Sequence, residues 1–372
     1  MNNTPISFTR PLPRRNFVQL LGLGAAGLAL ARTSTASAAE SGAAAAKAKP
    51  AGGKKQFRGL FPIGQSPFTA DNKLDLEGLA AQVTFCNRGG VHGFVWPQIA
   101  SGWTNLTPEE RLAGAEAILA AGKNGSTTLV IGVQSKDGNM QEVERYAKHA
   151  AEHGADAIVS LPPPNMTDEK QLLEYYQQVG RMTSLPLFVQ TQGEMSIDLA
   201  VQIYQTVPTA RYLKDESAAD GGPLQRVTEI RKRTNDEMKV FAGQGVRTMI
   251  NEMELGFSGH CPVVALADVY ASAFDLWHAG KKQEAFDMFG RILAFNSMGS
   301  ADSNALLVAR GVFKPGVHSR PTPGMGDGGG AGAGRGGAGR GGAGGGGRGG
   351  PRLDEQGIRH ALDTYLKPYL RA

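Results

Sequence analysis

The sequence predicts an α/β fold, a closed (β/α)8 barrel of the TIM type followed by a C-terminal helical extension. Short apolar runs, bounded by glycine, proline or polar residues, alternate with segments that have the i, i+3, i+4 spacing of amphipathic helices. Eight such pairs follow one another, which favours a closed parallel barrel over an open sheet. The chain of 372 residues is also long enough for a barrel of about 250 residues.

Eight strands are expected at short apolar runs, the kind that a parallel sheet buries on both faces. They are residues 57–63, 93–96, 127–133, 157–161, 187–190, 210–213, 239–242 and 260–264. Helices are expected between them, among others at residues 76–87, 108–121, 140–153, 169–179, 197–206 and 224–233. The barrel is therefore placed at residues 56–268.

Residues 269–372 are expected to form helices at 270–279, 281–298 and 354–370, interrupted by a flexible glycine-rich insertion at 323–351. Arg335, Arg340 and Arg348 in this insertion resemble the arginines of RNA-binding RGG tracts. Few aromatic residues accompany them. The net charge of +5 falls to +1 without the four arginines of residues 1–38, so we expect no nucleic-acid partner.

The first 38 residues have the order of an export signal. Arg14 and Arg15 precede an apolar run, and a small-residue site ends at Ala38. The apolar run is shorter than the roughly 20 residues of a membrane span. We expect a twin-arginine signal cleaved after Ala38, membrane contact only during export, and a periplasmic or extracytoplasmic protein. An uncleaved anchor is the alternative, and residues 39–55 are expected to be a disordered linker.

The chain contains two cysteines and seven histidines. Cys86 falls in the predicted first helix and Cys261 in the predicted last strand, so we expect free thiols. The histidines are scattered along the chain, and we expect no metal site. No phosphate loop or dinucleotide fingerprint is present, so no dissociable cofactor is expected.

One lysine is a candidate for covalent chemistry. Lys214 directly follows the predicted sixth strand, and residues at the carboxyl ends of barrel strands face the active site. A lysine withdrawn from water can lose its proton and attack a carbonyl carbon, which forms a Schiff base. Position alone favours the plainer alternative of a solvated lysine paired with Asp215 or Glu216.

Several motifs resemble the dihydrodipicolinate synthase / N-acetylneuraminate lyase family of class I aldolases. They are Ser66-Pro67-Phe68-Thr69, Asp75, Gly90-Val91-His92-Gly93, residues 106–111 and Tyr212-Leu213-Lys214. The resemblance covers residues 57–320 and 352–370, with the glycine tract inserted. It implies a barrel, a Schiff-base lysine at Lys214, a small carbonyl substrate (a keto acid or a sugar-like compound), and a homotetramer or homodimer.

The sequence departs from that family where the family moves protons and grips the substrate carboxylate. Gln190 stands in place of the strand-five tyrosine, and Pro163-Pro164 stand in place of a tyrosine pair. Met195 replaces an arginine, and residues 98–102 replace the carboxylate-binding loop. The resemblance therefore keeps the lysine and loses its proton relay.

Neutral polar side chains stand at the predicted strand ends instead. The predicted substrate-binding residues are Gln65, Ser66, Gln98, Ser101, Gln134, Gln190, Gln192 and Gln244. Amides exchange hydrogen bonds but do not move protons at neutral pH, so such a site suits a neutral or polyhydroxylated ligand. The alternative is that several of them face the barrel wall or solvent.

Glu216 is the second predicted catalytic residue, since strand alternation turns it to the same side as Lys214. It is a candidate proton acceptor in place of the lost tyrosine. The same carboxylate could instead hold the amine charged and suppress Schiff-base formation, or simply face solvent.

Three functions follow from these residues. The leading hypothesis is an exported Schiff-base lyase or aldolase with a non-standard substrate. The second is a barrel without catalysis that binds a small molecule outside the cytoplasm, which the loss of the relay favours. The third uses Lys214 and Glu216 as an acid–base pair without a Schiff base.

Overall fold

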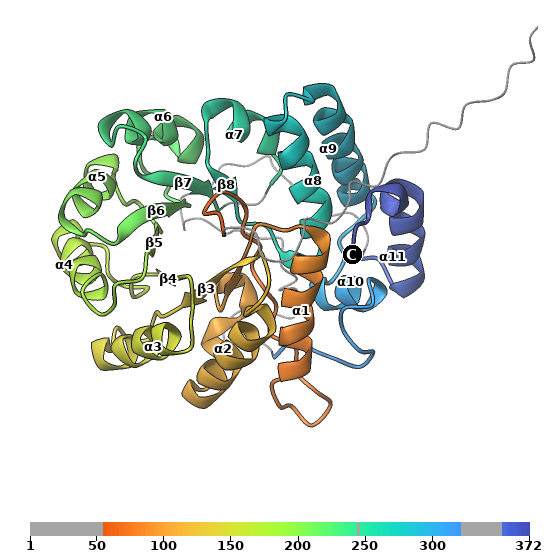
Figure 1. The fold of residues 1–372 in the computed structure, drawn as a ribbon, viewed down its shortest axis with the longest axis horizontal. Helices are drawn as coiled ribbons and strands as arrows, with labels where there is room; N and C mark the ends of the chain where they lie inside the picture. The colour runs from red at the N-terminus through yellow and green to blue at the C-terminus, as the bar shows by residue number, and fades with distance from the viewer. Residues whose placement is uncertain (1–54, 244–245, 321–351) are drawn as a thin grey trace, which may run out of the picture. The chain divides into compact units, whose positions relative to one another are not determined.

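The structure, a computed structural model, describes residues 55–243, 246–320 and 352–372. Eight parallel strands form a sheet in the order β1-β8-β7-β6-β5-β4-β3-β2, with helices around it (Figure 1). A bridge between Ile63 and Val95 brings the two edges together. The predicted (β/α)8 barrel with C-terminal helices is confirmed. The predicted export signal, the linker up to residue 54 and the glycine-rich insertion lie outside the described residues.

The strands are short, and most lie where the sequence predicts them. They are β1 (Gly59–Leu60), β2 (Gly93–Trp96), β3 (Thr128–Gly132), β4 (Ala157–Ser160), β5 (Leu187–Gln190), β6 (Ala210–Asp215), β7 (Lys239–Ala242) and β8 (Gly259–His260). The prediction that Lys214 follows the sixth strand is wrong. Its backbone pairs with Gln190 of β5 and Phe241 of β7, so β6 continues through it.

Each strand is followed by a helix, and the first five of these helices begin at a residue whose side chain caps them. The barrel helices are α1 (Leu76–Gly89), α2 (Pro108–Gly122), α3 (Met140–Glu152), α4 (Glu169–Val179), α5 (Ile197–Thr206), α6 (Pro223–Arg233), α7 (Met249–Leu255) and α8 (Ala267–His278). Asp75 caps α1, and Thr107 and Glu110 form a capping box at α2. Because α8 packs against β1 and α1, the ring of barrel helices continues past residue 268.

The core has two layers, one between the sheet and the helices and one inside the barrel. Inside, five rings form an aromatic plug: Phe57, Phe61, Phe188, Tyr212 and Phe241. The Phe188 and Tyr212 rings stack with centroids 4.5 Å apart, and Phe61 meets Phe241 edge-on at 5.0 Å. The interior at this level is therefore packed by side chains, as in other barrels of this type.

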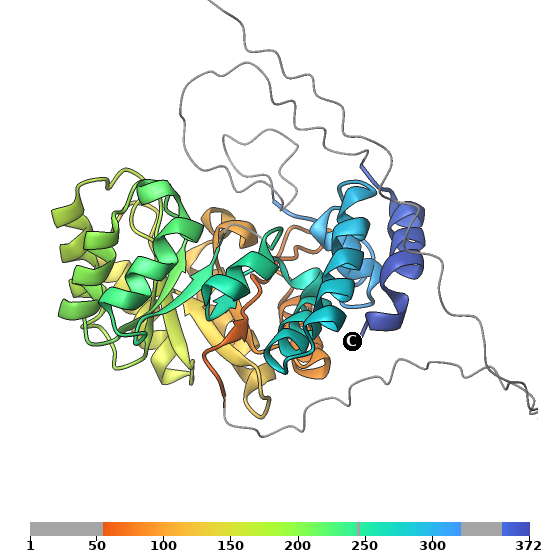
Figure 2. The same ribbon diagram turned by 90° about the horizontal axis from the view of Figure 1, so that it is seen from above.

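The C-terminal extension packs beside α8, outside the barrel (Figure 2). It contains α9 (Lys282–Ser297), α10 (Ser303–Ala309) and α11 (Glu355–Ala361). The single helix expected at 354–370 is wrong, since α11 passes into a π turn and then a 3₁₀ turn. Cys86 and Cys261 are free thiols, as predicted, and both are buried. In the part of the chain that the structure describes, none of the helices combines the length and apolar character needed to cross a bilayer.

Candidate active site

Lys214 lies inside the barrel, one layer beyond the aromatic plug. It is two residues past Tyr212 on β6, and side chains two apart on a strand face the same side. The residue is only 4% exposed, and its Nζ lies 3.1 Å from Oε1 of Glu216. A freely solvated lysine does not fit this environment.

Glu216 links the lysine to the neighbouring strands. Its Oε2 accepts a hydrogen bond of 2.8 Å from Nε2 of Gln190, at the end of β5. On the other side Gly243 follows β7, and a Cβ added there would lie 2.3 Å from Cγ of Glu216. The carboxylate therefore fits between the ends of β5 and β7 because residue 243 has no side chain.

Asp215, between these two residues, faces α6 and holds the strand end in place. Its Oδ2 accepts a hydrogen bond of 3.0 Å from Nε of Arg226, and both side chains are fully buried. Oγ1 of Thr191 donates to Oδ1 of Asp215 at 2.8 Å and accepts from the backbone N–H of Glu216 at 2.7 Å. Sequence reasoning missed this support, although a charged Arg226 on the apolar face of a predicted helix is a usable signal.

Three of the predicted glutamines are buried with amide atoms that lack a hydrogen-bond partner within the described residues. Gln98 follows β2 and has neither Nε2 nor Oε1 bonded. Gln134, after β3, donates to the Pro97 carbonyl at 3.0 Å but leaves Oε1 unbonded, as does Gln190. Unbonded buried amides are costly, so these atoms are suited to a polar ligand.

These three glutamines, together with Lys214 and Glu216, are called the barrel mouth below. All five belong to the carboxyl ends of β2, β3, β5 and β6 or to the residues that follow them. Carboxyl ends of barrel strands are where this fold carries its active sites.

The hydroxyl groups of the two predicted substrate-binding serines form hydrogen bonds within the protein. Oγ of Ser66 accepts a hydrogen bond of 3.0 Å from the indole of Trp96. Oγ of Ser101 accepts from the backbone N–H of Gln98 and donates to the Gly64 carbonyl at 2.6 Å. They join the loops after β1 and β2.

The remaining predicted substrate-binding residues are not part of the barrel mouth. The backbone of Gln65 exchanges hydrogen bonds with the side chain of Gln82, at 2.7 and 3.0 Å. Gln192 is half-buried in the loop after β5. Gln244 lies outside the described residues.

Two tyrosines of α4 lie near the barrel mouth, as does one cysteine. The hydroxyl of Tyr176 donates to the Gln190 carbonyl at 2.7 Å, and that of Tyr175 donates to the Leu161 carbonyl at 2.8 Å. Both hydroxyls are therefore bonded to backbone.

Burial raises the pKa of the Cys261 thiol to about 12, and the charges of Lys214 and Glu216 also act on it. This thiol stays neutral at physiological pH and is therefore a poor nucleophile.

Residues 56–324 match the model of the "Dihydrodipicolinate synthetase family". The chain is 26% identical over 200 residues to "4-hydroxy-tetrahydrodipicolinate synthase" of Methanosarcina mazei, a match covering 52% of this chain and 65% of the relative. It is 29% identical over 211 residues to "Probable 2-dehydro-3-deoxy-D-pentonate aldolase YjhH" of Escherichia coli, covering 55% of this chain and 68% of the relative. The chain thus spans about two thirds of the length of these curated relatives.

A solved structure supports the fold. The structure of YagE, a prophage protein of the dihydrodipicolinic acid synthase family from Escherichia coli K12 in complex with pyruvate, superimposes with a TM-score of 0.64 at 19% identity. The superposition covers 83% of this chain and 98% of that one. The barrel, the buried lysine on β6 and the match over residues 56–324 lead to one conclusion: the chain belongs to the dihydrodipicolinate synthetase family, whose members are lyases and aldolases.

Proposed function

We propose that the protein is a lyase or aldolase that forms a Schiff base between Lys214 and a small keto-acid or sugar-like substrate. The observation that carries this proposal is a buried primary amine at the carboxyl end of a barrel strand, 3.1 Å from a carboxylate. The reaction requires a neutral amine, and the carboxylate of Glu216 lies close enough to Nζ to receive its proton.

Schiff-base formation has two steps, formation of a carbinolamine and loss of water from it. Glu216 first takes a proton from Nζ of Lys214, and as the neutral Nζ attacks the carbonyl carbon, the protonated Glu216 gives that proton to the carbonyl oxygen, which becomes a hydroxyl group. The positively charged nitrogen of the resulting carbinolamine then passes a second proton to Glu216. Glu216 returns the proton to the carbinolamine hydroxyl, which leaves as water and generates the iminium ion. The positive nitrogen then withdraws electrons from the adjacent carbon, so that a C–C bond there can break or form. Glu216 would thus take over the proton transfers for which the family uses tyrosine.

The substrate class follows from the barrel mouth. Hydroxyl groups both donate and accept, so they can satisfy the unbonded amide atoms of Gln98, Gln134 and Gln190. Two relatives support a carbonyl compound as substrate. The Escherichia coli relative is named as an aldolase of a hydroxylated carbonyl compound, and YagE binds pyruvate, which is a keto acid. We therefore favour a hydroxylated carbonyl compound.

The test is a borohydride trap. The protein is incubated with pyruvate and a panel of keto acids and hydroxylated aldehydes, reduced, and weighed intact. We expect a mass increase that maps to Lys214 and disappears in Lys214→Ala. Lys170→Ala, at an exposed lysine of α4, is the matched control and should keep the adduct. A folded protein that forms no adduct with any carbonyl would contradict the proposal.

The Lys214–Glu216 ion pair also favours a second candidate, a binding barrel without catalysis, because a charged amine cannot attack a carbonyl. Glu216→Gln separates the two. If Glu216 transfers protons, turnover and the rate at which the adduct forms should both fall by about 100-fold or more in the variant. If Glu216 only holds the amine charged, the wild type binds ligand in calorimetry without adduct, and the variant gains one.

Export and assembly are part of the same proposal. The twin arginine and the small-residue site of residues 1–38 support a periplasmic or extracytoplasmic location, and the family resemblance supports a homotetramer or homodimer. Replacing Arg14 and Arg15 by lysine should retain the protein in the cytoplasmic fraction, whereas replacing Arg10 should not. Light scattering of the purified protein measures the assembly, and a monomer would contradict it.

A further inference from the structure

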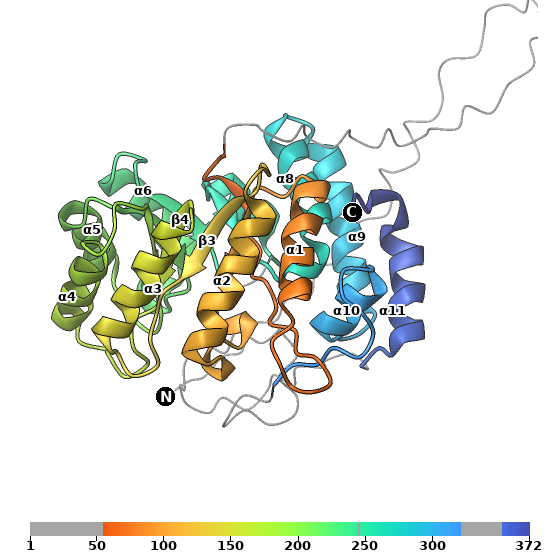
Figure 3. The same ribbon diagram turned by 60° about the horizontal axis from the view of Figure 1, so that its bottom comes forward.

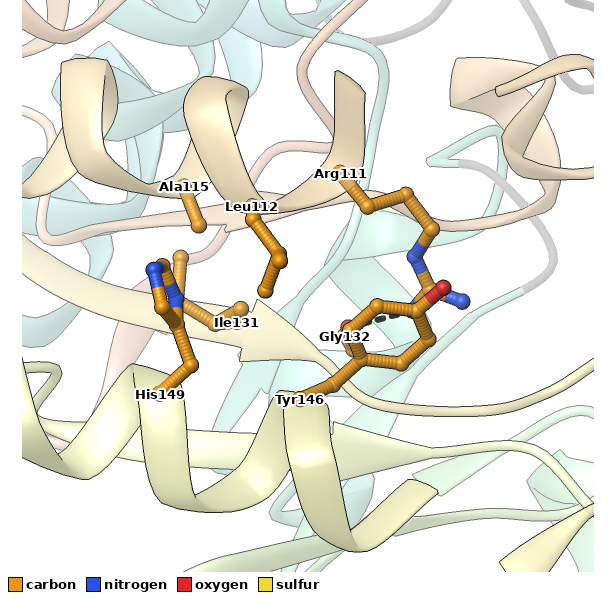
Figure 4. Close-up of a pocket in the computed structure, with 7 residues that line it drawn as sticks. All are labelled: Arg111, Leu112, Ala115, Ile131, Gly132, Tyr146 and His149. Carbon is orange, nitrogen blue, oxygen red and sulfur yellow. Dashed lines mark hydrogen bonds between the residues drawn. The ribbon is translucent and has the colours of Figure 1, made fainter. Parts of the chain in front are cut away.

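Away from the barrel mouth, a small pocket lies between α2, β3 and α3 (Figure 4). The two helices run side by side along one flank of the barrel (Figure 3). At one end of the pocket the guanidinium of Arg111 lies 3.8 Å from the ring centroid of Tyr146 and donates to the Gly132 carbonyl at 2.7 Å. His149 forms the opposite end of the pocket (Figure 4).

Beside this pocket, the metal-binding atoms of three side chains, Glu116, His149 and His153, lie within 4.8 Å of one another. Glu116 comes from α2, and His153 is the residue directly after α3. Nε2 of His149 lies 2.9 Å and Nε2 of His153 lies 3.8 Å from the same Oε1 of Glu116. Ligands of a tetrahedral zinc ion, each about 2.1 Å from the metal, lie about 3.4 Å apart, so the two distances bracket this spacing.

The expectation that the histidines are scattered is wrong at this place. His149 and His153 stand four residues apart, which puts both rings on one face of the helix, with centroids 4.1 Å apart. The third ligand comes from a different helix, so only the packing of α2 against α3 completes the group.

A hydrogen bond to the backbone orients the ring of His153. Nδ1 of His153 lies 2.9 Å from the His149 carbonyl, and a carbonyl only accepts, so Nδ1 carries the proton. The other ring nitrogen, Nε2, lies 3.8 Å from Oε1 of Glu116 and is the ring nitrogen available to a metal ion. A hydrogen bond from the second ring nitrogen to a backbone carbonyl is also the usual way in which a metal-binding histidine is oriented.

We propose that Glu116, His149 and His153 bind a divalent transition-metal ion, Zn²⁺ in the first instance, which joins α2 to α3. Two imidazoles and one carboxylate, with water in a fourth position, form a set that zinc accepts. Mg²⁺ and Ca²⁺ prefer sites built from oxygen ligands alone. Glu116 and His153 are exposed, so the ion reaches the site without unfolding of the helices. The site is independent of the chemistry at Lys214.

The full chain, stripped of metal with a chelator and dialysed, is titrated with zinc chloride by calorimetry. We expect one zinc ion per chain at this site and no binding of Mg²⁺. His153→Gln removes one ligand and should weaken zinc binding by about 100-fold or more, since changes even in outer contacts cost 10- to 100-fold. His360→Gln, at an exposed histidine of α11, is the matched control and should bind zinc like the wild type.

Thermal unfolding supplies a second readout. Zinc should raise the Tm of the wild type and of His360→Gln in a concentration-dependent manner, and should leave the Tm of His153→Gln unchanged. Equal Tm values of all three proteins without metal show that the substitutions leave the fold intact. A wild type that binds no zinc, or a His153→Gln variant that binds it equally well, would overturn the proposal.

Discussion

Two regions inside one barrel are built on opposite principles. In the aromatic plug every ring packs against its neighbours, whereas in the barrel mouth the amides of Gln98, Gln134 and Gln190 are buried with unbonded atoms. The same β5 and β6 supply both regions, since Phe188 lies two residues before Gln190 and Tyr212 two residues before Lys214. Two residues along a strand therefore separate a layer that stabilises the fold from a layer suited to a ligand.

The largest expected effect is in the plug. Phe188→Ala should lower the free energy of unfolding by about 3–5 kcal/mol, because it removes a buried ring and leaves a cavity among the other rings. Urea denaturation measures the change. Phe286→Ala, at a side chain that is 57% exposed, serves as control and should have little effect. Equal losses in the two variants would mean that the plug adds no stability.

A nearly equal loss of stability is expected at the buried ion pair of Asp215 and Arg226, which lies next to the barrel mouth. Asp215→Asn removes the buried carboxylate that Nε of Arg226 contacts, leaves the guanidinium only the half-exposed carboxylate of Asp220 at 3.3 Å, and should cost about 3 kcal/mol. Asp198→Asn breaks an exposed pair with Arg233 and should cost less than about 0.5 kcal/mol. Chemical denaturation of both variants compares them. If Asp215→Asn is as stable as the control, the strand end that carries Lys214 is held by other contacts.

Matched glutamine substitutions test the mouth directly. Gln98→Met removes an amide that has no partner among the described residues. It should leave stability unchanged, or raise it by up to about 1 kcal/mol, while weakening binding of a carbonyl ligand about tenfold. Gln82→Met removes an amide that bonds the backbone of Gln65 on both sides and should cost about 2 kcal/mol. Calorimetric ligand titration and urea denaturation are the measurements. A destabilised Gln98→Met would remove the contrast between mouth and plug.

The smallest effect concerns pH. Burial, followed by the charge of Arg58, lowers the pKa of His278 to about 4, and Arg58 donates to its Nδ1 at 2.7 Å. An unfolded histidine takes up its proton near pH 6.5, so between these values the unfolded state binds more protons. Stability should therefore fall as the pH drops from 7 to 5, by about 1 kcal/mol after allowance for the partial exposure of the ring.

His278→Gln should show a smaller loss over the same range, measured by urea denaturation at the two pH values. His360→Gln is the comparison, because its ring is exposed in the described structure. Identical pH profiles of the wild type and His278→Gln would contradict the assignment of this loss to His278.

The sequence by itself determined the barrel and showed that Lys214 stands near the carboxyl end of its sixth strand, although it placed the lysine after that strand and not within it. The bounds of β2, β5, α4 and α5 agree with the prediction residue for residue. Such elements depend on periodicity and capping, which are properties of a few neighbouring residues. The ends of β1, β6 and β8 could not be predicted as well, because a strand ends where its pairing with another strand ends.

Only the tertiary structure decided which polar groups meet. Glu216 contacts Gln190 across two strands, Asp215 contacts Arg226 across a strand and a helix, and Glu116 approaches His149 from a neighbouring helix. No local pattern distinguishes the bonded amide of Gln82 from the unbonded amide of Gln98. The difference arises from strand register and helix packing, which bring together side chains that lie far apart in the chain and set which of them find a partner.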